Sequence, residues 1–217
     1  MIKAVIFDMD GVIIDSEPVY LEKDLEFART KNPDVVLKDL YGMVGSSRKD
    51  AWSCMARAIH NGQTWEELRD EFRDSRDVYS EMDYRKIFRP EIPGLLEELK
   101  KMGLRLALAS STGIDIIERV LRENEIRSCF EVVVTGAQFK RSKPDPEIYH
   151  YTAAQLGIPE DQCLAIEDST FGVTAASRAG MKIAALIDHR FHFDQSLADY
   201  RMESLNEVLE IARKLSV

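Results

Sequence analysis

The feature that most constrains the fold is a regular alternation of apolar and amphipathic segments from about residue 90 to the C-terminus. The apolar segments are short, rich in aliphatic and β-branched residues and typical of buried strands. The segments between them have helical periodicity. This alternation predicts an α/β fold, with a parallel sheet that is covered by helices on both faces. We expect strands at 2–7, 104–109, 131–135, 163–167 and 182–187, and helices at 93–103, 111–124, 145–157, 170–180 and 204–215.

The stretch between the first strand and residue 90 has a different character. Residues 50–62 indicate a helix that ends at glycine, and the charged residues 65–88 also have a helical period. No strand is evident there, and about seventy residues suffice for a small domain. We therefore expect a core of residues 1–14 and 90–217, with an all-helical insert at residues 15–89.

Charge and hydropathy exclude several classes of partner. The net charge of −9 makes nucleic acid an improbable ligand, because phosphate backbones require a basic surface. The apolar runs are shorter than the roughly 18 residues of a membrane-spanning helix, and the N-terminus lacks the features of a signal peptide. The three widely spaced cysteines fit reduced thiols of a cytoplasmic protein. We expect a monomer that binds neither nucleic acid nor membrane.

Polar residues with complementary chemistry follow four of the predicted strands. Because parallel strands end at one edge of a sheet, these residues should lie close together. They are Asp8 and Asp10; Ser110, Ser111 and Thr112; Lys143; and Glu167 and Asp168. Crowded carboxylates repel one another unless a cation joins them, and Mg²⁺ prefers such oxygen ligands. The edge therefore predicts a magnesium site suited to phosphoryl transfer, in which an aspartate can be the nucleophile.

Four short motifs carry a family resemblance. DMDG at 8–11, ALASS at 107–111, SKPDPEIY at 142–149 and AIEDS at 165–169 resemble, in order and spacing, the motifs of the haloacid dehalogenase superfamily. The insert resembles the C1 cap of subfamily I, and the chain is similar to the β-phosphoglucomutase-like phosphatases and mutases. The resemblance implies a Rossmann-like three-layer core, a bound Mg²⁺ and an aspartyl-phosphate intermediate.

The resemblance also implies a role for each matching residue. Asp8 matches the nucleophile, Asp10 the general acid and base, Ser110 a phosphate-binding hydroxyl and Lys143 the lysine that offsets negative charge. Ser111 and Gly11 would contribute to phosphate binding. The metal would be held by Asp8, Asp10 (through its carbonyl), Asp168 and Glu167. Members that cleave carbon–halogen bonds lack the second acid, so the presence of Asp10 argues against dehalogenation.

The insert favours hydrolysis over phosphoryl transfer within a sugar. Arg48 matches an arginine that mutases use to hold the non-reacting phosphate, and an ordinary surface arginine is the alternative. Mutases carry a cap histidine where this chain has Tyr20, and a cap lysine where it has Ser75. We therefore expect a phosphatase of small phosphorylated metabolites, with a hexose-phosphate mutase as the second hypothesis and a silent ligand-binding protein as the third.

Overall fold

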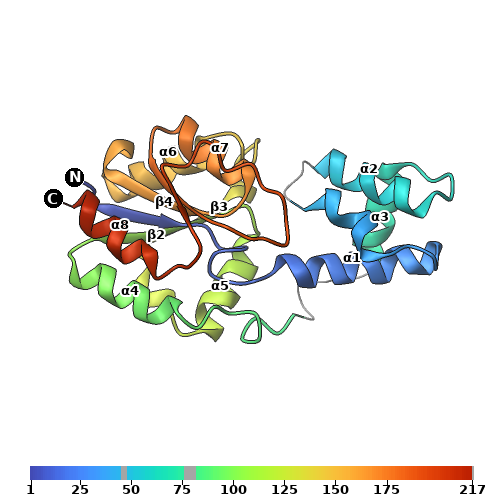
Figure 1. Ribbon diagram of the computed structural model, residues 1–217, viewed down its shortest axis with the longest axis horizontal. Helices are drawn as coiled ribbons and strands as arrows, with labels where there is room; N and C mark the ends of the chain where they lie inside the picture. Colours follow the sequence, from blue (N-terminus) through green and yellow to red (C-terminus); the bar gives the residue numbers. More distant parts are fainter. Residues whose placement is uncertain (45–47, 76–81, 217) are drawn as a thin grey trace. The chain divides into compact units, whose positions relative to one another are not determined.

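A computed structural model describes residues 1–44, 48–75 and 82–216 of the chain. Its sheet has six strands in the order β3-β2-β1-β4-β5-β6, and all neighbouring strands are parallel (Figure 1). The strands are β1 (Ala4–Phe7), β2 (Arg105–Ser110), β3 (Val132–Thr135), β4 (Cys163–Glu167), β5 (Lys182–Leu186) and β6 (Tyr200–Met202).

The helices occupy the segments between the strands and the stretch that follows β1. The α-helices are α1 (Glu17–Lys31), α2 (Arg48–Ile59), α3 (Trp65–Ser75), α4 (Ile92–Lys101), α5 (Ile114–Glu123), α6 (Glu147–Leu156), α7 (Thr170–Arg178) and α8 (Glu207–Leu215). The 3₁₀ helices are η1 (Leu37–Met43), η2 (Arg127–Cys129), η3 (Gly136–Gln138) and η4 (Glu160–Gln162).

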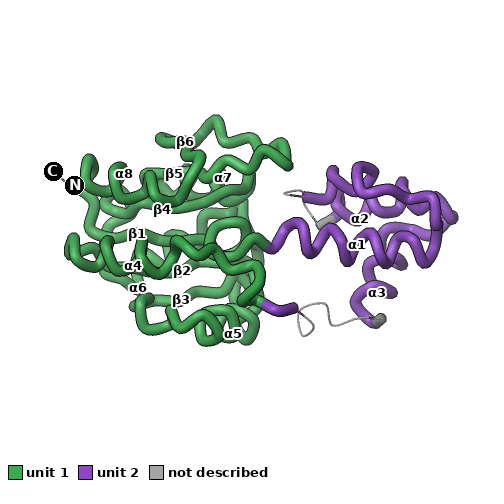
Figure 2. Tube along the Cα trace, turned by 60° about the horizontal axis from the view of Figure 1, so that its bottom comes forward, with its two compact units in different colours: residues 1–15, 84–217 green, residues 16–83 purple. Residues whose placement is uncertain are grey.

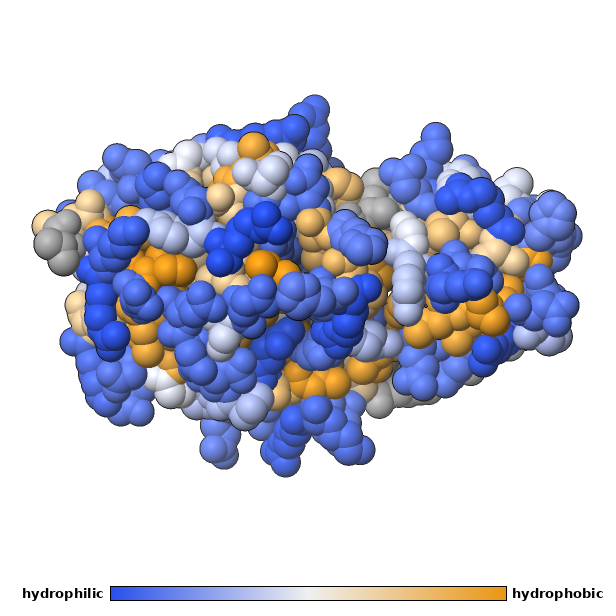
Figure 3. Space-filling view, in the orientation of Figure 1, coloured by the Kyte–Doolittle hydropathy of each residue, from blue (hydrophilic) through white to orange (hydrophobic). Residues whose placement is uncertain are grey.

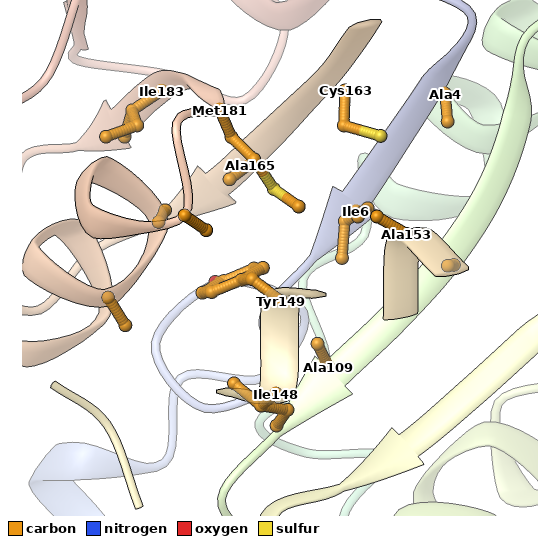
Figure 4. Close-up of a cluster of buried hydrophobic side chains, with 14 of the residues drawn as sticks. Ala4, Ile6, Ala109, Ile148, Tyr149, Ala153, Cys163, Ala165, Met181 and Ile183 are labelled. Atoms are coloured by element: carbon orange, nitrogen blue, oxygen red, sulfur yellow. The ribbon is translucent and has the colours of Figure 1, made fainter. Parts of the chain in front are cut away.

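Helices cover both faces of the sheet, which confirms the α/β, Rossmann-like prediction. Helices α6 and α7 lie on one face, and α4, α5 and α8 lie on the other (Figure 1). Figure 4 shows part of the core under α6 and α7, where Tyr149 and Ile148 pack beside Ile6 of β1 and Ala109 of β2. All four residues of β1 are buried, as expected for a central strand whose two faces are both covered.

The register of the sheet brings three strand ends together. Phe7, the last residue of β1, pairs with Leu108 of β2 on one side and with Ile166 of β4 on the other. The residues that follow these positions therefore meet at the carboxyl edge, where open parallel sheets bind their ligands.

The chain divides into two compact units (Figure 2). Unit 1 consists of residues 1–15 and 84–217, and unit 2 of residues 16–83. The described elements of unit 2 are all helical. In unit 2 the ring of Trp52 on α2 lies 6.4 Å from that of Phe27 on α1 and 5.4 Å from that of Phe72 on α3, so Trp52 joins the three helices.

The structure differs from the sequence-based expectation in two segments. Residues 82–88 were expected in a helix but contain a turn, followed by a bridge between Phe88 and Ile14. Tyr84 is completely buried there, so contacts with the rest of unit 1 override the helical period. Strand β6 was not predicted, because a strand of three residues carries too little periodicity to recognise.

The surface seen in Figure 3 is mostly hydrophilic, with apolar patches between hydrophilic residues. None of the helices in the described part of the chain combines the length and the apolar character needed to cross a membrane.

One partly buried acid of unit 2 contributes to the pH dependence of stability. Asp24 lies on α1 on the side of the buried Leu21 and Ala28, and burial raises its pKa from 3.8 to about 7. Between these values the folded protein binds more protons than the unfolded chain, so stability falls as pH rises from about 4 to about 7. We expect Asp24→Asn to raise Tm by about 2–4 °C at pH 8 and to have little effect at pH 4.5.

The control for this prediction is Glu22→Gln, which changes an exposed carboxylate on the same helix. Thermal unfolding of both variants and the wild type at the two pH values provides the comparison. An equal shift of Tm at both pH values would contradict the assignment to Asp24.

Candidate active site

Asp8 begins the site, because it is the first residue after the buried strand β1. Its backbone amide donates to the carbonyl of Ile166 at 2.9 Å, which continues the sheet by one residue. The side chain is nearly buried, and burial raises the pKa of Asp8 from 3.8 to about 8 despite the attraction of Lys143. The negative charges of Glu167 and Asp10 contribute further to this rise.

Lys143 is a buried cation that joins three elements of the core. Its ammonium donates to Oδ1 of Asp8 at 2.7 Å, to Oε1 of Glu167 at 2.6 Å and to the carbonyl of Ala109 at 3.0 Å. Burial alone would lower the pKa of Lys143, but the charges of Asp8 and Glu167 raise it well above its usual value. The lysine therefore keeps its charge and all three donors are used.

Tyr149 supports the same carboxylate from α6. Its hydroxyl donates to Oε1 of Glu167 at 2.5 Å, and the ammonium of Lys143 lies 5.1 Å from the centre of its ring. Burial and the charge of Glu167 raise the pKa of Tyr149 well above its usual value, so the hydroxyl keeps its proton. Glu167 thus holds Lys143 and Tyr149 in place.

Two glycines have no side chain at the positions where the carboxyl groups of Asp168 and Glu167 lie. A Cβ atom at Gly11, whose φ is +77°, would lie 2.0 Å from Oδ2 of Asp168. A Cβ atom at Gly172 on α7 would lie 1.9 Å from Oε2 of Glu167. Neither position can carry a larger residue without movement of the carboxylate beside it.

Asp168 is held from a loop that follows β5. The buried side chain of Gln195 donates to the carbonyl of Asp168 at 2.5 Å and to the carbonyl of Leu186 at 2.7 Å. These two bonds tie the backbone after β4 to the end of β5.

A turn after Asp10 is supported by an arginine that follows unit 2 in the sequence. Arg89 donates to the carbonyl of Gly11 at 3.0 Å and lies 3.7 Å from Asp15. Asp15 also pairs with Arg190 at 2.6 Å. Charged groups distant in the sequence therefore fix the turn that carries Gly11.

The donor set fits a hard divalent cation. One oxygen from each of Asp8, Glu167 and Asp168 can be chosen so that these atoms lie within 4.8 Å of one another. Among the described residues these three carboxylates share the ammonium of Lys143, so the ionised cluster carries excess negative charge. A divalent cation would compensate this charge and favour the ionised form of Asp8.

Asp10 has different partners from Asp8. Its Oδ2 accepts a hydrogen bond from the hydroxyl of Thr112 at 2.7 Å and lies 3.5 Å from the hydroxyl of Ser110. Ser110 is completely buried, and its Oγ accepts from the amide of Thr112 at 3.1 Å. Ser110 does not cap α5, which begins at Ile114 after Gly113 without a side-chain cap.

Most of the residues selected from the sequence come together at the edge of the sheet. The structure joins Asp8, Asp10, Gly11, Ser110, Lys143, Glu167 and Asp168 through the contacts above. Ser111 is exposed beside Ser110. Arg48 opens α2 and Ser75 ends α3, but their side chains lie outside what the structure describes. The catalytic roles of all these residues remain predictions.

Sequence reasoning placed Thr112 at the edge of the sheet without an individual role, and it assigned no role to Tyr149, Gln195 or Arg89. Tyr149 is the last residue of the third motif and Thr112 directly follows the second motif, so the sequence could have indicated that both lie at the site. Gln195 and Arg89 belong to no motif, and only the folded chain reveals their contacts.

Comparisons with known proteins agree with the geometry. Residues 5–186 match the family model described as haloacid dehalogenase-like hydrolase. The chain is 31% identical to hexitol phosphatase B of Escherichia coli K12, covering 95% of this chain and 94% of the relative. It is 30% identical to a phosphorylated carbohydrates phosphatase of Thermotoga maritima, covering 98% and 99%. A solved Thermotoga maritima structure assigned as a β-phosphoglucomutase aligns with a TM-score of 0.75 at 28% identity, over 98% of this chain and 99% of that chain.

The role of Gly11 leads to a first prediction for the site. Gly11→Ala would impose about 1–3 kcal/mol of backbone strain and displace Asp168, so we expect kcat/KM to fall about 10²-fold. Gly94→Ala is the control, because a Cβ atom there meets nothing within 4 Å. Steady-state kinetics of hydrolysis measure the effect. Unchanged values in Gly11→Ala would contradict the packing argument.

The contact of Tyr149 leads to a second prediction. Tyr149→Phe leaves a buried carboxylate oxygen without one donor, and we expect the free energy of unfolding to fall by about 1–3 kcal/mol. Tyr151→Phe removes the hydroxyl of a partly exposed neighbour that keeps its ring contact with Phe139. Urea unfolding should show almost no change in this control. Similar losses in both variants would be inconsistent with a special role for the bond to Glu167.

Proposed function

Since the chain belongs to the haloacid dehalogenase-like hydrolase family, we propose that it is a Mg²⁺-dependent phosphatase of a small phosphorylated carbohydrate. The observation that carries the proposal is the contact of Asp8 with Lys143 at 2.7 Å, inside a cluster of carboxylates suited to a divalent cation. The chain is an enzyme of this family, and its relatives named above include two phosphatases.

The first half of the reaction transfers the phosphoryl group to the protein. An oxygen of Asp8 attacks phosphorus while the bond between phosphorus and the ester oxygen breaks. Asp10 gives its proton to the departing alcohol. Lys143 orients Asp8 and offsets part of the negative charge that gathers around it.

The second half returns Asp8 to its initial state. Asp10, now ionised, takes a proton from a water molecule, and the water oxygen attacks phosphorus of the aspartyl-phosphate. The acyl phosphate bond breaks, inorganic phosphate leaves and Asp10 is protonated again. The same carboxyl group therefore acts first as acid and then as base.

Asp8 and Asp168 would hold the metal through their side chains, and Asp10 through its backbone carbonyl. Bound Mg²⁺ would stabilise the negative charge of the phosphoryl oxygens. Glu167 supports this arrangement chiefly through Lys143, since its Oε1 accepts from both Lys143 and Tyr149.

Unit 2 is proposed to act as the cap that selects the substrate. Residues 15–89 were the expected insert, and the compact unit comprises residues 16–83. Arg48 is the proposed contact for a distal anionic group of the substrate. A monomeric state and a cytoplasmic location belong to the same proposal.

A hexose-phosphate mutase is the second candidate. The likeness to the solved Thermotoga maritima structure that is assigned as a β-phosphoglucomutase favours this candidate. Tyr20 and Ser75 stand where mutases of the family carry a histidine and a lysine, and these departures favour the phosphatase. The two candidates share Asp8 and Asp10, so the products must distinguish them.

The test is phosphate release from a panel of sugar, sugar-alcohol and nucleotide monophosphates, with Mg²⁺ and with chelator. We expect metal-dependent release from a carbohydrate phosphate. Asp8→Asn should lower the rate at least about 10³-fold, because the amide cannot form the phosphoryl intermediate.

The matched control is Asp34→Asn, which removes an exposed carboxylate in unit 2 and should leave the rate unchanged. A parallel assay supplies β-glucose 1-phosphate with a bisphosphate primer. Isomerisation without phosphate release would establish the mutase instead. Full turnover by Asp8→Asn would refute the mechanism.

A further inference from the structure

Thr112 links the second motif to the predicted general acid. Its hydroxyl donates to Oδ2 of Asp10 at 2.7 Å, and its amide donates to Oγ of Ser110 at 3.1 Å. Its carbonyl accepts a hydrogen bond from the hydroxyl of Thr135, at the end of β3, at 2.7 Å. The side chain of Thr112 is therefore aimed at Asp10 while its backbone is fixed from both sides.

Because Oδ2 of Asp10 accepts the bond from Thr112, the proton that Asp10 delivers would lie on Oδ1. The bond is an ordinary hydrogen bond while Asp10 is protonated, and it becomes charge-assisted and stronger once the proton has left. The bond to Oδ2 restricts rotation of the Asp10 carboxyl group about its side-chain torsions. The more distant hydroxyl of Ser110, at 3.5 Å from the same oxygen, cannot provide this restriction alone.

We infer that Thr112 is a positioning residue that orients the Asp10 carboxyl group for proton transfer to the leaving alcohol. This inference rests on the proposed function, because it requires Asp10 to act as the acid. Thr112 exchanges no proton with the substrate. Its contribution is to set the direction in which the proton is delivered.

A purely structural role of Thr112 predicts a different pattern of defects. Loss of a loop contact would disturb phosphate binding and the attack by Asp8, and would slow every substrate. Misdirection of Asp10 slows only those esters whose leaving group requires a proton. An alkyl alcohol requires one, whereas p-nitrophenol leaves as a stable anion.

The experiment compares kcat/KM for a sugar phosphate hydrolysed by the wild type and for p-nitrophenyl phosphate. The value of kcat/KM includes only the steps up to departure of the alcohol or phenol. Thr112→Val keeps the shape of the side chain but removes the donor. We expect it to lower kcat/KM about tenfold for the sugar phosphate and less than about twofold for the aryl ester, since general acid catalysis contributes about 10²–10⁴-fold in total.

Two further variants complete the design. Thr112→Ser restores the hydroxyl and should recover most of the lost activity. Thr174→Val removes a hydroxyl that is bonded to the carbonyl of Thr170 within α7, and should change neither ester. Equal losses for both esters in Thr112→Val, or no loss for either, would overturn the inference.

Asp10→Asn separates this inference from the proposed function. If Asp10→Asn loses the sugar phosphate activity selectively and Thr112→Val does not, the inference fails while the role of Asp10 stands. If Asp10→Asn shows no selectivity between the esters, the proposed acid is wrong and the assignment of Thr112 fails with it.

Discussion

The ammonium of Lys143 is the interaction on which the active-site edge depends. It reaches the end of β1 through Asp8, the end of β2 through the carbonyl of Ala109 and the end of β4 through Glu167. An uncompensated buried charge is costly, so lysine and carboxylates stabilise one another only while all three strand ends keep their register. The geometry of the nucleophile is thus coupled to the integrity of the central sheet.

Strong local patterns made much of the fold and the site predictable. β1, β2 and β4 are short apolar segments followed by polar residues, and a parallel sheet must bring their ends together. Asp8, Ser110 and Asp168 could therefore be placed near one another without coordinates. The turn at residues 82–88 could not be predicted, because burial of Tyr84 depends on a surface that only the folded core provides.

The supporting contacts of the site were also beyond the sequence. Gln195 reaches the carbonyl of Asp168 from 27 residues further along the chain, and Arg89 reaches the carbonyl of Gly11 across 78 residues. Every residue has a backbone carbonyl, so the residue types of such a pair do not indicate that the two residues are bonded. Reading the sequence therefore finds the groups that would react more readily than the groups that hold them.

Gly11 and Gly172 show that missing atoms can define a site as firmly as present ones. Each of these two positions is filled by a carboxylate that a methyl group would displace. A designer who transplanted only the acids onto another parallel sheet would find their places already occupied by side chains. A transplanted centre would therefore need glycine at both of these positions as well as the acids themselves.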